Sequence, residues 1–114
     1  MQEQTFSLQT EFRIYRDADI NALLFEEILN SSPETWSFMV LEPDRPIQSS
    51  HFMQVVSPNR EGHFFLEIGF GATETGYSLY LLCTEDKNVV LQHLIAYWQN
   101  QIIPDVSSWE DIST

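Results

Sequence analysis

Two polar residues lie among the aromatic and branched residues of strand-like segments. They are Gln54 and Glu67. A polar side chain in the middle of a strand either faces solvent or forms hydrogen bonds in the core. If both face outward beside His63 and Phe65, they line a sheet face of aromatic and carboxylate groups, a surface suited to a basic protein. A solvated face that binds nothing is the alternative interpretation.

Three histidines raise the question of a metal site. His63 and Glu67 are four residues apart on a predicted strand and share a face, and a neighbouring strand would bring His51 close to them. Zinc sites use three or four convergent ligands, and the sequence has no HxH, HExxH or CxxC spacing. We therefore predict no metal ligand, and we expect His93, on an apolar helix face, to be partly buried.

No pattern typical of a catalytic residue is present. Cys83, the single cysteine, lies in an apolar run that favours a buried thiol, and no serine lies in a G-x-S-x-G segment. The loop that begins at Gly69-Phe70-Gly71 joins two predicted strands, contains Glu74 and lacks lysine, whereas phosphate loops open a helix. Adjacent acids such as Glu26 and Glu27 are typical of solvated surfaces. We predict a protein that is not an enzyme and binds no cofactor.

These side chains need a framework of strands, which hydropathy alternation predicts. Period-two patterns or apolar runs favour five strands, at residues 6–15, 36–41, 51–56, 63–70 and 77–83. Helical spacing predicts one helix between Asp17 and Ser31 and another from Thr84-Glu85-Asp86 to Pro104. The order β-α-β-β-β-β-α predicts a single α+β domain over residues 1–114, with a mainly antiparallel sheet of about five strands and two principal helices.

The same patterns predict which side chains are buried. Four of the predicted elements, two strands and two helices, have an apolar face: Phe6, Leu8, Phe12 and Ile14; Ile20, Leu23, Leu24 and Ile28; Phe64, Leu66, Ile68 and Phe70; Val89, Val90, His93, Leu94, Tyr97, Trp98 and Ile102. Two prolines should exclude residues 42–46 from a ladder, and 71–76 should form a polar loop. The acidic tail, residues 105–114, should dock through Trp109.

Charge constrains the class of partner. Seventeen acidic residues against five basic ones give a formal net charge of -12, while 43% of the residues are hydrophobic. Such a field repels nucleic acid and anionic membrane and attracts a basic protein. No apolar run reaches the roughly 20 residues of a membrane span. The first residues lack the features of a signal peptide, and one cysteine fits a reducing compartment, so we expect a cytoplasmic protein.

The second half of the chain, about residues 50–110, resembles small immunity proteins of bacterial polymorphic toxin systems. The shared pattern is an aromatic-x-Gln strand, a strand bearing Leu-Glu, an aromatic strand, an Asp-led helix ending in Trp, and a terminal Trp. The matching residues are 51–54, 62–67, Tyr77, Asp86, Trp98 and Trp109. Where the pattern has a basic residue and a His after the Glu, this chain has Gly69-Phe70-Gly71 and Tyr77-Ser78.

The resemblance implies a protein that binds a cognate toxin, a basic nuclease or deaminase, and covers its active site. The expected partner-binding residues combine carboxylates with aromatic support: Glu42, Asp44, Gln54, Phe65, Glu67, Glu74 and Tyr77. Two alternatives remain open. One is a small-ligand module whose pocket is lined by Trp36, Phe70, Trp98 and Trp109. The other is a homodimer or larger homo-oligomer that buries its exposed aromatic residues.

Overall fold

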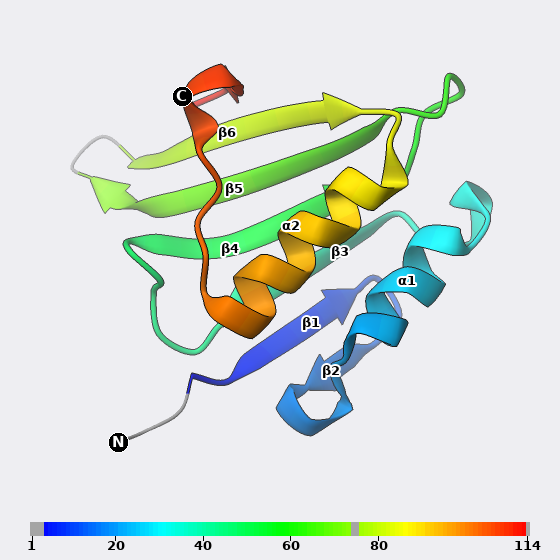
Figure 1. The fold of residues 1–114 in the computed structure, drawn as a ribbon, viewed down its shortest axis with the longest axis horizontal. Helices are drawn as coiled ribbons and strands as arrows, with labels where there is room; N and C mark the ends of the chain where they lie inside the picture. Colours follow the sequence, from blue (N-terminus) through cyan, green and yellow to red (C-terminus); the bar gives the residue numbers. More distant parts are fainter. Residues whose placement is uncertain (1–3, 74–75, 114) are drawn as a thin grey trace.

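The chain folds into one antiparallel sheet with two helices, which confirms the α+β class. The computed structural model describes residues 4–73 and 76–113. Their sheet has seven strands, in the order β2-β1-β3-β4-β5-β6-β7, rather than about five. Figure 1 shows α1 and α2 on the same side of this sheet. The elements are β1 (Phe6–Thr10), β2 (Ile14–Arg16), α1 (Ala22–Asn30), β3 (Phe38–Pro43), β4 (Ser50–Val56), β5 (Phe64–Thr73), β6 (Gly76–Thr84), α2 (Lys87–Asn100) and β7 (Glu110–Asp111).

The predicted strand over residues 6–15 is instead a hairpin. The Thr10 backbone N–H donates to the carbonyl of Arg13 at 2.9 Å, and the Thr10 hydroxyl oxygen accepts from the backbone N–H of Arg13 at 3.2 Å. The chain therefore reverses, and β2 pairs with β1. Phe12 is 78% exposed and Ile14 is 51% exposed, so their predicted place on the face of Phe6 is wrong. The alternation of apolar and polar residues continues through the turn in the sequence, but the chain reverses there, so these residues do not share one face.

Helix α1 begins later than Asp17 or Asp19, which form a short 3-10 turn. Its N-cap is Asn21, whose side-chain oxygen accepts from the backbone N–H of Leu24 at 2.8 Å. This start point decides which residues face the sheet. Phe25 and Leu29, one helical turn apart, are buried, while Leu23 is 61% exposed, against our prediction.

The strand ends also differ from the sequence prediction. Strand β3 includes Glu42 and Pro43, and Pro43 pairs with Phe6 of β1. Proline is tolerated there because the pairing of β3 with β4 has already ended at Leu41. Strand β5 runs to Thr73 and β6 starts at Gly76, so most of the predicted loop at 71–76 is strand.

Helix α2 begins as predicted and ends earlier. The Asp86 carboxylate accepts from the backbone N–H of Asn88 at 2.9 Å, which caps the helix start. The helix ends at Asn100 because Gln101 is left-handed, with φ 51°, so Pro104 does not end it. Helix α2 buries Val90, Leu94 and Tyr97 against the sheet.

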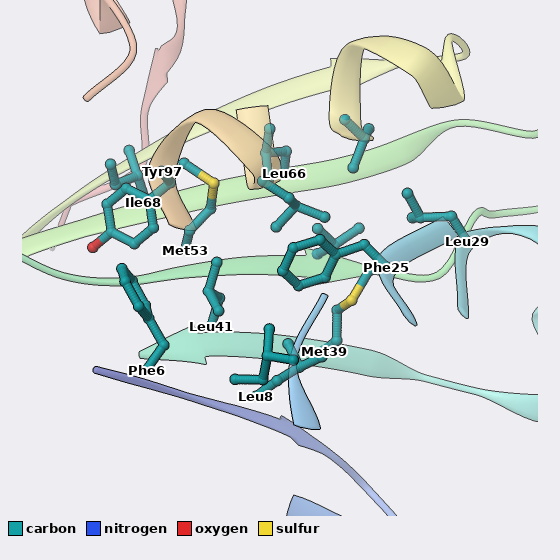
Figure 2. Packing of buried hydrophobic residues seen from close by; sticks show 14 of the residues in the cluster. Phe6, Leu8, Phe25, Leu29, Met39, Leu41, Met53, Leu66, Ile68 and Tyr97 are labelled. Carbon is teal, nitrogen blue, oxygen red and sulfur yellow. The ribbon is translucent and has the colours of Figure 1, made fainter. Parts of the chain in front are cut away.

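The core lies between the sheet and the helices. Figure 2 shows side chains from β1, β3, β4 and β5 meeting Phe25, Leu29 and Tyr97 of the helices. The ring of Tyr97 lies 6.0 Å from that of Phe6, edge to face, and that of Phe25 lies 5.7 Å from Trp98. Each fully buried large apolar side chain contributes roughly 1.5–3 kcal/mol through burial.

The C-terminal segment adds the last strand to the sheet. In β7, Glu110 pairs with Leu81 and Asp111 with Tyr80 of β6. The ring of Trp109 lies 5.5 Å from that of His93, edge to face. His93 is half-buried, and burial lowers its pKa from the usual 6.5. The C-terminal segment therefore packs against α2 and adds an edge strand beside β6, which widens the sheet.

Candidate protein-binding face

The side of the sheet opposite the helices is not covered by any helix of the described residues. Cross-strand partners point to the same side of a sheet, so the register places side chains on it unambiguously. We call this side the uncovered face. Its residues from β2 to β7 are Ile14, Arg16, Ser7, Gln9, Phe38, Val40, Glu42, Phe52, Gln54, Val56, Phe65, Glu67, Gly69, Leu79, Leu81, Cys83 and Glu110.

The uncovered face is apolar over its central strands. An antiparallel sheet with one solvated face alternates apolar and polar residues along each strand. Strand β6 does not: Leu79 and Leu81 lie on the uncovered face, and Tyr80 and Leu82 lie on the other. A strand that is apolar on both faces is typical of a sheet covered on both sides, and here the helices cover only one.

Gln54 and Glu67 lie at the centre of this face. They are direct cross-strand partners, and Gln54 Nε2 donates to Glu67 Oε2 at 3.5 Å. Their next neighbours in the same row are apolar, Val40 on β3 and Leu81 on β6. Both polar side chains are half-buried. The sequence interpretation that Gln54, Phe65 and Glu67 share one sheet face agrees with this register.

Burial changes the acidity of Glu67. Desolvation raises the pKa of its carboxyl from the usual 4.5, and the hydrogen bond from Gln54 opposes that change. Within residues 4–73 and 76–113, the ion pairs shorter than 4.0 Å join Arg45 to Asp44 and His63 to Glu85. No described basic group therefore compensates the Glu67 charge.

An aromatic ring covers the backbone next to this pair. A Cβ added at Gly69 would lie 2.5 Å from Phe52 Cζ and 3.1 Å from Leu79 Cδ2. The absence of a side chain at Gly69 thus leaves room for the Phe52 ring, whose end lies over this backbone position beside Leu79. Such an aromatic side chain over a strand glycine shields the backbone and keeps the register.

The other predicted binding residues are distributed unevenly. Glu42 is exposed on the uncovered face, while Asp44 lies just past β3 and accepts from the backbone N–H of Thr5 at 3.3 Å. An open cleft of about 390 Å³ brings Glu42 and Asp44 together with Phe52. Glu74 and the side chain of Tyr77 lie outside the described residues, so these two predictions stay untested.

Two residues from the sequence interpretation lie at the end of the uncovered face. His63 precedes β5, and its Nε2 lies 3.1 Å from Glu85 Oε1. Cys83 pairs with Phe65 and is exposed, so the predicted buried thiol is wrong. Burial was expected because Cys83 follows an apolar run, but its side chain points away from the helices.

Sequence reasoning missed several apolar residues of the face: Phe38, Val40, Val56, Leu79 and Leu81. A signal for them was present. Strands 38–41 and 79–82 are apolar at every position, and such runs indicate burial on both faces rather than a solvated side.

Basic residues are few near the centre of this face. Arg13 lies over the ring of Tyr15, with Cζ 4.7 Å from the ring centroid, and Arg16 lies at the β2 edge. Arg45 follows β3, and Lys87 at the start of α2 donates to Asn30. Strands β4, β5 and β6 carry one carboxylate, Glu67, and no lysine or arginine.

The four aromatic residues expected to line a ligand pocket have different neighbours. Trp36 is buried and donates through Nε1 to the Ser31 carbonyl at 3.4 Å. Phe70 packs against Tyr80 at 5.8 Å, whereas Trp98 contacts Phe25. Trp109 packs against His93. The four residues thus have different nearest partners, although Trp36 belongs to the hydrophobic core and the other three pack against it.

Two further findings concern metal binding and membrane-spanning helices. In the described part of the chain, no three His, Cys, Asp or Glu side chains are grouped so as to hold a metal ion. None of the described helices has the length and apolar character that crossing a membrane requires.

Comparisons with known proteins add no family. No protein-family model matches the sequence. A search of curated proteins finds no match, and neither does a search of solved structures.

Proposed function

We propose that this chain is a non-enzymatic, cytoplasmic protein that binds and inhibits a basic partner through the uncovered face. The observation that carries the proposal is that most residues of β3 to β6 are apolar on the uncovered face as well as on the covered one, while helices cover only one face. Large exposed apolar patches with a polar rim mark protein-binding surfaces. A partner seated there would give the sheet its second cover.

Charge favours a basic partner over a second copy of the chain. A net charge of -12 on each copy would oppose a face-to-face homodimer, because the two faces carry the same sign. A basic protein is attracted by the same field, and such attraction raises association rates to about 10⁸ M⁻¹s⁻¹ or more at low salt. A solution mass of twice 13.3 kDa would contradict this choice.

The resemblance to immunity proteins suggests which basic partner this is. A nuclease or deaminase toxin has a basic groove for nucleic acid, and an acidic inhibitor competes for that groove. Rapid capture suits a role in which the toxin must not turn over in the cell that makes it. We therefore propose a cognate bacterial toxin of this class as the partner.

The test is capture of a partner from cell extract with three baits, followed by inhibition of the purified partner. The baits are the wild-type protein, Phe65→Ser on the uncovered face, and Leu23→Ser, which alters an exposed leucine of α1 as a matched control. We expect wild type and Leu23→Ser to capture one basic polypeptide that high salt releases. Phe65→Ser should capture at least about tenfold less, as expected for a central aromatic anchor.

The exposed thiol gives an independent measurement on the same face. Cys83 should react with an alkylating reagent in the free protein and be protected in the complex, because it lies beside Phe65. Equal alkylation rates with and without partner would contradict the proposed face. A captured protein that has no activity for this chain to inhibit would contradict the inhibitor role.

A further inference from the structure

The centre of the uncovered face is a lone carboxylate within an apolar surround. Glu67 has one hydrogen bond, the 3.5 Å contact from Gln54, and no basic neighbour within 4.0 Å among the described residues. A long bond to a neutral amide leaves most of the carboxylate charge uncompensated. This charge remains acceptable in the free protein because water still reaches it.

Docking of a partner would remove that water. Val40 and Leu81 flank the pair within its row, and Phe65 precedes Glu67 by two positions on the same face. A protein seated on these apolar groups would exclude solvent from Glu67 as well. A buried carboxylate without a compensating charge strongly opposes binding, so the partner must supply a cation at this point.

The arrangement of acceptors selects the kind of cation. Because Gln54 donates through Nε2, its Oε1 remains an acceptor beside the two carboxylate oxygens of Glu67. A planar guanidinium has five donors that match such an array, is weakly hydrated and stacks on aromatic rings. A lysine ammonium is a compact, strongly hydrated charge that fits an apolar surround less well.

Resting on the proposed function, we propose that Gln54 and Glu67 form the recognition site for an arginine side chain of the partner. The guanidinium would donate to both Glu67 oxygens, and a further N–H would reach Gln54 Oε1. The surrounding apolar residues exclude water from this contact, the arrangement found around energetically dominant interface residues.

The test uses peptides, so it does not depend on knowing the partner. A random peptide library displayed on phage is selected on the full-length wild-type protein, with removal of peptides that also bind Glu67→Gln. We expect arginine to be enriched at one position of the selected peptides. Each synthetic peptide is then compared with versions carrying lysine or citrulline there, citrulline being the neutral analogue of similar shape.

The expected pattern separates charge from shape. Citrulline should weaken binding at least about tenfold, because hydrogen bonds to charged groups are the strong ones. Lysine should weaken it about threefold or more, since it keeps the charge but not the planar fork. Gln54→Leu should reduce the preference for arginine over lysine, because it removes the third acceptor.

The controls match the net charge and test folding. Glu67→Gln and Glu26→Gln each change the charge by one unit, but Glu26 lies exposed on α1. Binding should fall at least about tenfold in the first and less than about twofold in the second. The melting temperature of each variant shows that the fold is intact.

Three results would overturn the inference: selected peptides without arginine, arginine peptides that bind Glu67→Gln as well as wild type, or no peptide that distinguishes the two proteins. Failure of the proposed function looks different. An arginine peptide that depends on Glu67, with no inhibited protein partner, would leave the recognition site standing and remove the inhibitor role. A partner bound through Phe65 whose arginines are dispensable would do the reverse.

Discussion

The two faces of the sheet are built from similar residues but have different environments. On the covered face, Met53, Leu66 and Ile68 are fully buried beneath the helices. On the uncovered face, Phe52 and Phe65 come from the same two strands and Leu81 from the neighbouring β6, and all three are only half-buried. Side chains of similar hydrophobicity thus stabilise the fold on one face and remain available on the other. Folding explains the first set, and binding is our explanation for the second.

Local features also distinguish the two faces. The covered face includes a buried polar contact in which the Ser50 hydroxyl lies 2.8 Å from the Tyr97 hydroxyl. The uncovered face has a carboxylate at its centre, with the pKa of Glu67 raised by burial. A satisfied polar contact helps to specify a core, whereas an uncompensated charge is typical of a surface that acts on something else.

The sharpest test compares two adjacent residues of β5. Leu66→Ala should destabilise the protein by about 3 kcal/mol, because it leaves a cavity beneath the helices. Phe65→Ala, one residue earlier and on the opposite face, should cost about 1 kcal/mol or less, since its ring is already partly in water. Urea unfolding of both variants measures the difference. Equal losses would show that the uncovered face belongs to the folding core.

A second test probes how the uncovered face is packed. Gly69→Ala should destabilise by about 2 kcal/mol, because the new Cβ would meet the Phe52 ring, and overpacking typically costs about 1–3 kcal/mol. In the Phe52→Ala background the same change should cost much less. A double-mutant cycle in urea measures the coupling. Additive effects would mean that Phe52 does not cover this glycine.

Regular alternation made part of this architecture predictable. Strand β5 follows from a period-two pattern, β6 follows from an apolar run, and the start of α2 follows from the capping residue Asp86. The hairpin at residues 11–13 could not be found in this way, because Phe12 and Ile14 continue the alternation of β1. The face of α1 also depended on one cap, Asn21, whose choice over two nearby aspartates is set by the tertiary structure.

The sequence predicted only part of the candidate site, because alternation within one strand does not show how neighbouring strands pair. Alternation places Phe65 and Glu67 together, but pairing of Gln54 with Glu67 needs the register between β4 and β5. Sequence fixes register only through long-range packing, so a single chain does not reveal it. The apolar neighbours of the pair, Val40 and Leu81, come from strands about forty positions apart, and only the sheet brings them together.

A third test addresses the polar contact of the covered face. Tyr97→Phe should destabilise by about 1 kcal/mol, because it removes one buried hydrogen bond while Ser50 Oγ keeps its bond to the Ile47 carbonyl. Ser50→Ala and the double variant, measured alongside it, complete a double-mutant cycle. Thermal or urea unfolding gives both values. No loss in Tyr97→Phe would mean that the contact does not contribute to stability.

The smallest predicted effect is a gain in stability rather than a loss, and it concerns Glu67 on the uncovered face. Because burial raises the pKa of Glu67, the folded protein holds that proton more tightly than the unfolded chain does. Its contribution to stability is thus fully present below the ordinary pKa of 4.5 and is lost as pH rises through the folded pKa. Glu67→Gln removes this titration while keeping the shape of the side chain.

We therefore expect Glu67→Gln to be slightly more stable than wild type at pH 7, by less than about 1 kcal/mol, because water still reaches this half-buried side chain. The difference should shrink as the pH is lowered below the ordinary pKa of 4.5, because the raised pKa keeps the Glu67 carboxyl of the folded protein mostly protonated there. Urea unfolding of the two proteins at several pH values gives this difference directly. A variant that is less stable than wild type at pH 7 would show that the carboxylate stabilises the fold, and that the uncovered face resembles the covered one more than its exposure indicates.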